Sequence, residues 1–426
     1  MTRLSTQNLS VGYNKKVLIG GIDIDIAPGE VVSLIGPNGA GKSTVLKSIT
    51  RQLEKLGGEI YVDGENAAAL SYKSFATRFS VVLTERLKTE RMTCEEIVEA
   101  GRYPYTGFFG RLTEEDRRIV RESLALVGGE PLAELPFDAI SDGQRQRILL
   151  ARAICQQPQI MVLDEPTSFL DIRYKIELLS ILRRLAAERG MSVLLSLHEI
   201  DLAAKISDKI VCVDGDKISA VGAPEEIFQG DTIRSLYGIA RGDYNLLFGS
   251  VELEKPQGAP RVFVLAGGGS GIPVYRALQR KNIPFSTGVL CENDVDFQVA
   301  RSLAAEIVSV PAFAVLTEQD AARGAEAMLR AGALLAVCER FGEANGAAKS
   351  LVALAKEKNI PVYTDVSQVP ATVPAAESSA RADAGNAAPA GQTSGSSAGE
   401  GSEAMAQKER AAEGAAGAAG EAKHEG

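Results

Sequence analysis

The sequence of 426 residues contains no apolar run long enough to cross a lipid bilayer. Its longest runs, such as Val31 to Ile35 and Ser192 to Leu197, have the length of buried β-strands. The stretch from Met1 to Lys16 mixes polar and apolar residues and lacks the continuous apolar core of a signal peptide. We therefore expect a protein that is not exported. If it works at a membrane, other chains must supply the pore.

The sequence is also poor in the patterns that metal sites, disulfide frameworks and nucleic-acid surfaces require. Its five cysteines are scattered without paired metal-type spacing, so a reducing cytoplasm fits best. A formal net charge of −9 and a sequence pI of about 5.2 argue against a nucleic-acid partner, which would need a basic stripe. What is present is an average soluble composition, 45% hydrophobic and 24% charged, in a chain long enough for two or three domains.

The chain divides by pattern into two α/β domains and a tail. From residue 1 to about 250, short β-branched runs alternate with helical patterns, which predicts an α/β domain. Prolines and glycines between 251 and 260 indicate a linker. The alternation returns from 261 to 370 and predicts a small doubly wound parallel sheet of Rossmann-like type. Residues 371–426 are mostly Ala, Gly, Ser and Glu, a composition that predicts a disordered tail.

A phosphate-binding loop is the strongest motif, because it follows the predicted strand Val31 to Ile35 and precedes the helical run Val45 to Thr50. Its residues are Gly36, Pro37, Asn38, Gly39, Ala40, Gly41, Lys42, Ser43 and Thr44. The glycines let successive backbone N–H groups turn toward phosphates, and the helix N-terminus adds positive potential. Lys42 would reach the outer phosphates and Ser43 would bind Mg²⁺. The alternative, a glycine-rich turn that binds nothing, is disfavoured by this strand-loop-helix setting.

Two acids follow another buried strand. The apolar run Ile160 to Leu163 ends at Asp164 and Glu165, so both carboxylates emerge at a strand end. Asp164 would hold Mg²⁺ through water, and Glu165 would polarise the attacking water. Taken alone, the pair could merely start a turn before Pro166, but the phosphate loop favours the catalytic interpretation.

A polar segment opens the predicted helix Arg145 to Cys155. Ser141 and the N–H group of Gly143 could present a second anion site at the helix N-terminus, with Gln144 beside them. From the residues alone, an N-cap without further function is the commoner explanation. Both interpretations stay open at this point.

In this order the motifs resemble the nucleotide-binding domains of ABC transporters, over about residues 1–240. The resemblance implies that Ser141 opens the signature motif, that Ser168 to Asp171 is the D-loop, and that His198 is the switch histidine. It places Tyr13 where the family stacks an aromatic ring on adenine. Outside such a series, a lone histidine at a strand end is more often structural, and the alternative for Tyr13 is an ordinary strand tyrosine.

The resemblance also implies an architecture and partners. The fold would be a P-loop NTPase cassette of ABC type with a helical subdomain, using ATP and Mg²⁺, with Lys42, Glu165 and His198 as catalytic residues. The expected partners are a second copy of the chain, two integral-membrane permease subunits and an extracytoplasmic substrate-binding protein. The chain would then be a peripheral subunit at the cytoplasmic face of the cell membrane.

The sequence departs from the family pattern at two places. The signature carries Ile140 and Asp142, and the acid would put negative charge near a γ-phosphate. The glutamine that the family uses after the strand Phe79 to Leu83 aligns with Thr84, whose hydroxyl is too short to replace it. We expect the neighbouring Glu85 to supply an oxygen ligand to Mg²⁺ in its place. The alternative is that Glu85 is a solvated surface acid.

Within the family, the segment Gly101 to Tyr105 and the later Gly222 to Ile227 look like the importers of iron-siderophore complexes, haem and cobalamin. We rank ferric siderophore first, cobalamin second and haem third. The rival class is a soluble ABC ATPase that acts on DNA or ribosomes, which would carry a long coiled coil or two cassettes. Neither is present, and the span between phosphate loop and signature predicts helices at Thr93 to Ala100 and Thr113 to Val127.

The second domain has a weaker motif. Gly267 to Gly271 follows a predicted strand and suggests phosphate or nucleotide binding, with Glu292 near the next strand end as a ribose-binding acid. A dinucleotide fingerprint fails, because Ile272 stands where a third small residue is required. A domain that senses an unknown small ligand and a scaffold that stabilises a dimer remain equal alternatives.

Overall fold

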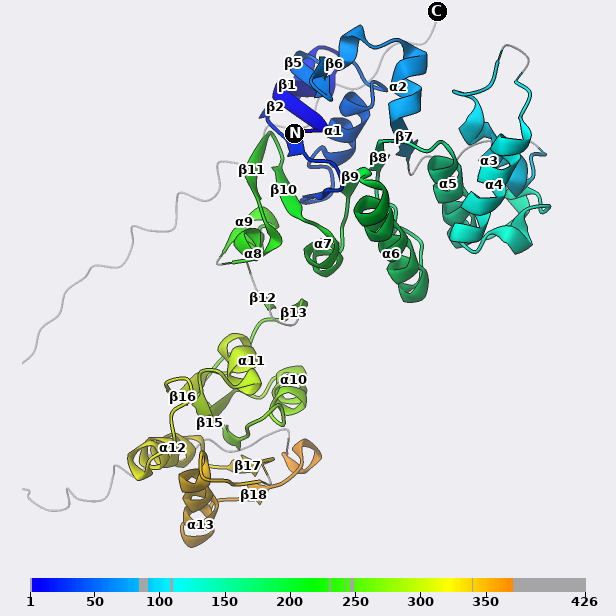
Figure 1. Cartoon of the computed structure of the whole chain (residues 1–426). Helices are drawn as coiled ribbons and strands as arrows, with labels where there is room; N and C mark the ends of the chain where they lie inside the picture. Colours follow the sequence, from blue (N-terminus) through cyan, green and yellow to red (C-terminus); the bar gives the residue numbers. More distant parts are fainter. Residues whose placement is uncertain are drawn as a thin grey trace, which may run out of the picture. The chain divides into compact units, whose positions relative to one another are not determined.

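The computed structural model describes residues 2–83, 91–107, 110–229, 231–240, 242–245, 249–338 and 340–370 (Figure 1). The predicted tail at 371–426 and the pair Thr84 and Glu85 lie outside these residues. Across the described ranges, no helix is both long enough and apolar enough to span a membrane.

A mixed sheet organises the first part of the chain. Its strand order is β11 (Lys217–Gly222), β10 (Lys209–Asp214), β4 (Val31–Ile35), β9 (Ser192–Ser196), β8 (Ile160–Leu163) and β7 (Phe79–Val82). All neighbours from β10 to β7 pair in parallel, and β11 is antiparallel to β10. Strands β4, β8 and β9 are buried along their whole length, which explains their unbroken apolar runs. Because these three are neighbours, the segments that follow them meet at one edge of the sheet.

An antiparallel sheet covers the first helix. Its order is β2 (Lys16–Ile22), β1 (Leu4–Tyr13), β5 (Gly57–Val62) and β6 (Glu65–Asn66), and β3 (Asp25–Ile26) also pairs with β1. Helix α1 (Lys42–Ile49) places Val45 and Leu46 in one hydrophobic cluster with residues of both sheets. Helix α2 (Tyr72–Arg78) joins this cluster through Phe75, whose ring stacks on Phe79. The phosphate loop is thus held by a helix that is packed on two sides.

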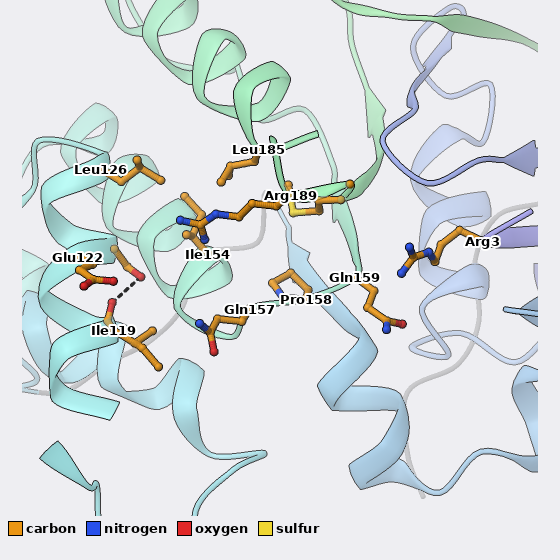
Figure 2. Close-up of a pocket in the computed structure, with 13 residues that line it drawn as sticks. Arg3, Ile119, Glu122, Leu126, Ile154, Gln157, Pro158, Gln159, Leu185 and Arg189 are labelled. Carbon is orange, nitrogen blue, oxygen red and sulfur yellow. Dashed lines mark hydrogen bonds between the residues drawn. The ribbon is translucent and has the colours of Figure 1, made fainter. Parts of the chain in front are cut away.

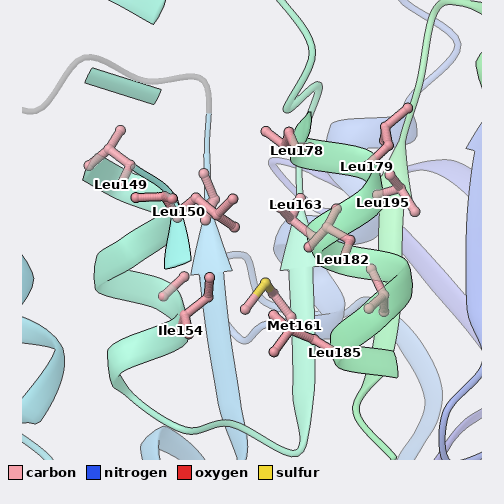
Figure 3. Packing of buried hydrophobic residues seen from close by; sticks show 14 of the residues in the cluster. Leu149, Leu150, Ile154, Met161, Leu163, Leu178, Leu179, Leu182, Leu185 and Leu195 are labelled. Carbon is pink, nitrogen blue, oxygen red and sulfur yellow. The ribbon is translucent and has the colours of Figure 1, made fainter. Parts of the chain in front are cut away.

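Helices cover the opposite face of the mixed sheet. Along β8, Ile160 and Val162 belong to the cluster of α1, whereas Met161 and Leu163 belong to the second cluster, as the two-residue period of a strand requires. Figure 3 shows Met161 and Leu163 among leucines of α6 (Ile172–Arg189) and α5 (Asp142–Cys155). Short helices α7 (Ile200–Ile206), α8 (Pro224–Ile227) and α9 (Thr232–Leu236) contribute to the same cluster.

The predicted helical region is confirmed by α3 (Cys94–Glu99) and α4 (Glu114–Leu126), each begun by a capping box. Arg102, buried between them and α5, donates to Asp116 at 2.8 Å and to the Cys155 carbonyl at 2.9 Å. The ring of Tyr105 lies 4.0 Å from the Arg102 guanidinium. These two residues of the importer-like segment therefore hold the helical region together.

A second, fully parallel sheet confirms the predicted doubly wound fold. Its order is β16 (Glu306–Val310), β15 (Phe285–Cys291), β14 (Val262–Leu265), β17 (Leu334–Ala336) and β18 (Val362–Tyr363). Helices α10 (Ile272–Arg280) and α11 (Val295–Leu303) share one hydrophobic cluster with the sheet, and α12 (Glu318–Ala331) and α13 (Lys349–Glu357) share another. The first strand lies between β15 and β17, so the sheet order reverses there.

A short hairpin precedes this second sheet. Strands β12 (Asp243–Asn245) and β13 (Ser250–Glu252) pair antiparallel, and β13 reaches into the segment 251–260 that the sequence predicts as a linker. The buried carboxylate of Glu252 forms an ion pair with Arg276 of α10. The hairpin is therefore fastened to the domain that follows it.

Candidate active site

The phosphate loop runs from the end of β4 to the first residue of α1. Gly39 and Gly41 have φ angles of 79° and 99°, which favour glycine. A Cβ atom on Gly41 would also lie 2.7 Å from the Ile19 side chain, and one on Gly36 would lie 2.1 Å from the Val213 carbonyl oxygen. The loop geometry thus excludes side chains where the motif has glycine.

Lys42 is buried at the start of α1. Its ammonium donates to the carbonyl oxygens of Gly36 at 2.7 Å and Pro37 at 2.9 Å, so it lies against the loop. Burial lowers the pKa of Lys42 below its usual range, although the carboxylates of Glu165 and Asp164 oppose the shift. A cation held in this position is available to phosphate oxygens above the loop.

Asp164 lies at the centre of a hydrogen-bond network at the end of β8. Its carboxylate accepts from the hydroxyls of Ser43 at 3.0 Å and Ser196 at 2.7 Å. The N–H group of Glu165 donates to the same Ser196 hydroxyl at 2.8 Å. The two predicted Mg²⁺ ligands, Ser43 and Asp164, are therefore brought together, and their oxygen donors suit Mg²⁺.

Ser196 was missed by sequence reasoning. The available signal was a hydroxyl directly after the apolar run of β9, next to the strand that precedes the two acids. No group of three or more His, Cys, Asp or Glu side chains able to hold a metal occurs in the described part of the chain.

Glu165 directly contacts the predicted switch histidine. Its Oε1 atom lies against Nε2 of His198, and its Oε2 accepts from the Ser168 hydroxyl at 3.2 Å. Glu165 has a φ angle of 47°, a left-handed conformation that is uncommon outside glycine. Strands β8 and β9 thus place a carboxylate and an imidazole in contact beside Asp164.

The signature segment forms an N-cap within the single chain. The Ser141 hydroxyl accepts from the N–H of Gln144 at 3.3 Å, and the Gln144 side chain accepts from the N–H of Ser141 at 2.9 Å. The unusual Asp142 is paired with Arg145 at 2.9 Å, which offsets its charge. Among described residues, no hydrogen bond joins Ser141, Gly143 or Gln144 to the phosphate loop. A single chain therefore does not bring its signature segment and its phosphate loop together.

Gly143 instead lies beside the D-loop. A Cβ atom there would be 3.4 Å from the Leu170 side chain. Within the D-loop, Phe169 has a φ angle of 65° and is 84% exposed. The side chain of Phe169 is thus held outward beside the signature segment.

Two tyrosines border the phosphate loop. Tyr13, at the end of β1, is 48% exposed, and its hydroxyl accepts from Thr44 at 3.4 Å. Its ring is therefore available to a planar base. Tyr237, which sequence reasoning missed, accepts from the N–H of Gly36 at 3.2 Å, and burial raises its pKa to about 12. No sequence motif marks Tyr237, since it directly follows the short helix α9, far along the chain from the phosphate loop.

Replacing Tyr13 with alanine is expected to weaken ATP binding by about 1 to 2 kcal/mol through loss of stacking on the adenine. Tyr13→Phe, which keeps the ring and loses only the long hydrogen bond from Thr44, is the matched control and should bind nearly as the parent does. Isothermal titration calorimetry with ATP measures both. An unchanged affinity in Tyr13→Ala would make this tyrosine a structural residue only.

The first part of the chain also contains a cavity of about 420 Å³ away from the phosphate loop. Figure 2 shows Leu126 of α4, Ile154 of α5 and Leu185 of α6 around it, with Arg3 at its far side. None of the phosphate-loop residues lines this cavity. It is therefore not part of the site built by β4, β8 and β9.

Comparison with known proteins gives the family. Residues 19–168 match the family model described as ABC transporter, and residues 285–390 match the MJ0874 family. An uncharacterized ABC transporter ATP-binding protein of Methanocaldococcus jannaschii is 43% identical over 288 residues, which are 67% of this chain and 99% of the relative. The cobalamin import ATP-binding protein of Halobacterium salinarum is 32% identical, covering 78% of this chain and 85% of the relative. The iron(3+)-hydroxamate import ATP-binding protein of Bacillus subtilis is 35% identical, covering 56% and 89%.

The matched family residues contain the whole phosphate loop and the two acids that follow β8. The relative from Methanocaldococcus jannaschii is covered over almost its full length. The chain belongs to the ABC transporter ATP-binding proteins, which are ATPases coupled to transport.

Proposed function

We propose that this chain powers an ABC importer for ferric siderophore complexes. The observation that carries the ATPase part is the convergence of Lys42, Asp164, Glu165 and His198 at one edge of the mixed sheet. The cargo is supported by relatives named for import of iron(3+)-hydroxamate, petrobactin and ferric enterobactin, each about a third identical. No residue of the cassette reads the cargo, so the cargo rests on these relatives.

Cobalamin is the second candidate, favoured by one observation. The cobalamin import relative matches 342 residues of this chain, whereas the iron(3+)-hydroxamate relative matches 239. A match of that length cannot be confined to the predicted cassette of 1–250. The similarity to the cobalamin relative therefore includes the second domain. Haem ranks third.

In the proposed reaction, the loop N–H groups and Lys42 hold the phosphates of ATP. Ser43 and Asp164 would hold Mg²⁺, which supplies charge neutralisation to the transferring phosphoryl group. Glu165 accepts a proton from the attacking water and so makes it a better nucleophile. His198 contacts the carboxylate of Glu165 and keeps it oriented toward that water.

We further propose that the site is completed by a second copy of the chain. The N-terminus of α5 carries backbone N–H groups and the Ser141 hydroxyl, and among the described residues no hydrogen bond joins it to its own phosphate loop. The partner's Ser141 and the N–H of its Gly143 would complete the γ-phosphate site. The Ser141 hydroxyl can donate its O–H to a phosphate oxygen while it still accepts from the N–H of Gln144.

The remaining assembly follows from the family. Two integral-membrane permease subunits and an extracytoplasmic substrate-binding protein would join the dimer, which sits at the cytoplasmic face of the membrane. The proposed boundaries are 1–250 for the cassette, 251–260 for the linker and 261–370 for the Rossmann-like domain. Glu85 or Thr84 is proposed to supply an oxygen ligand to Mg²⁺.

Copurification and uptake test the assignment. The tagged chain should copurify with two membrane subunits, and ATP hydrolysis by the reconstituted complex should rise with binding protein loaded with a ferric hydroxamate. A rise with cobalamin alone would replace the cargo by the second candidate. Copurification with ribosomes or DNA, without membrane subunits, would contradict the importer assignment.

A further inference from the structure

Backbone N–H groups of the glycine-rich loop Gly267 to Gly271 are already bound to a carboxylate of the chain itself, that of Asp296. The N–H of Gly269 donates to the Asp296 carboxylate at 3.1 Å. The N–H groups of Gly271 and Ile272 donate to the same carboxylate at 3.0 Å. In a strand-loop-helix turn, these are the donors that a bound phosphate would use.

Asp296 is fully buried, and its burial raises the pKa of the carboxyl group even though the N–H donors oppose the shift. A second carboxylate is adjacent, since Asp294 accepts from the N–H of Gly268 at 2.9 Å. A phosphate entering the loop would have to displace one carboxylate and approach the other. The phosphate interpretation of Gly267 to Gly271 therefore loses its physical basis.

A cavity of about 580 Å³ lies beside this loop. Residues that follow β14, β15 and β17 line it, at the place where the sheet order reverses and where open parallel sheets bind ligands. Much of its wall is apolar, including Val289, Leu290, Leu316 and Val337. Its volume falls in the usual range for small-molecule sites, about 300 to 1,000 Å³.

The polar groups in the wall have opposite charges. Asp294, the N-cap of α11, presents a carboxylate whose oxygens also accept from the N–H groups of Gly268 and Asp296, and Arg340 contributes a guanidinium from the segment after β17. Within the described residues, the Arg340 guanidinium makes no ion pair, whereas its carbonyl oxygen accepts from Asn345 at 3.2 Å. One acceptor and one cation across an apolar cavity select a ligand that carries a donor and an anion.

We propose that this cavity binds a small organic acid that also carries an amine or hydroxyl group, and that it does not bind a nucleotide. The amine or hydroxyl would donate to Asp294, and the carboxylate would pair with Arg340, whose planar fork matches a carboxylate. The second domain is then a sensor of an amino acid or a hydroxy acid, attached to an ATPase.

Two cysteines in the wall allow ligand binding in the cavity to be measured by thiol labelling. Cys291 and Cys338 line it and are partly exposed, whereas Cys94, Cys155 and Cys212 are buried. Cys291 ends β15 and Cys338 follows β17, with β14 between these two strands, and both thiols are free. Burial raises the pKa of Cys291, so alkylation should be run at about pH 8.5.

The experiment follows iodoacetamide labelling of the full chain by mass spectrometry, with the proteinogenic amino acids and α-hydroxy acids as probes. At about ten times its dissociation constant, a probe that occupies the cavity should slow labelling of Cys291 and Cys338 about tenfold. ATP should leave both labelling rates unchanged. Protection by no member of the panel, or protection by ATP, would overturn the proposal.

Variants separate the two recognition groups. Asp294→Asn should abolish protection, and Glu292→Gln, an exposed acid on the same turn, is the matched control that should keep it. Arg340→Gln should remove the preference for a free acid over its methyl ester, a readout that a folding defect does not mimic. Equal discrimination in Arg340→Gln and the parent would contradict the role of Arg340.

Discussion

Replacing Lys42 with alanine is expected to lower the rate of ATP hydrolysis by at least about 100-fold, the scale seen when one donor to a developing charge is removed. The ammonium is held by the Gly36 and Pro37 carbonyl oxygens, so its position is set before ATP arrives. No other described cation lies on the loop to replace it. Steady-state phosphate release measures the effect.

Lys42→Arg is the matched control for charge. It keeps the cation but lengthens the side chain in a buried position, so hydrolysis should also fall although nucleotide affinity is partly retained. Thermal unfolding of both variants should show a folded cassette. Hydrolysis by Lys42→Ala at the parental rate would remove Lys42 from the catalytic site.

Replacing Glu165 with glutamine is expected to slow hydrolysis by about 100- to 10,000-fold while ATP stays bound. Glutamine preserves the size of the side chain and the contact with His198 but cannot accept the proton of the attacking water. Because hydrolysis no longer ends the bound state, an ATP-loaded dimer should accumulate. Size-exclusion chromatography with and without ATP detects it.

Ser168→Ala is a useful comparison, because it removes only the hydrogen bond to Oε2 of Glu165. It should reduce the rate much less than Glu165→Gln does. Parental turnover in Glu165→Gln would mean that another group activates the water.

Sequence reasoning identified the site residues that lie in contiguous motifs. The phosphate loop, Asp164 and Glu165 are recognisable because each follows a short buried strand, and strand order then brings them together. Ser196 and Tyr237 were missed, because their hydrogen bonds to Asp164 and Gly36 join residues far apart in the chain. Such contacts depend on tertiary packing, which no local pattern encodes.

The second domain shows the converse problem. Its parallel sheet was predictable from alternating strands and helices, and Gly267 to Gly271 follows a strand and precedes a helix, a setting that suggests phosphate binding. The carboxylate of Asp296, at the start of helix α11, accepts from the N–H groups that a phosphate would use. A glycine pattern predicts backbone N–H donors but does not predict which group accepts from them.

The central claim, that each ATP site combines Lys42 of one chain with Ser141 of another, is tested most directly by mixing two inactive variants. Lys42→Ala and Ser141→Arg chains should each fail to hydrolyse ATP alone. Mixed in equal amounts, half of the dimers pair the two variants and each has one intact site, so about a quarter of the parental sites should return. If hydrolysis reappears on mixing, the shared site is confirmed. Persistent inactivity of the mixture, in the presence of demonstrated mixed dimers, would contradict it.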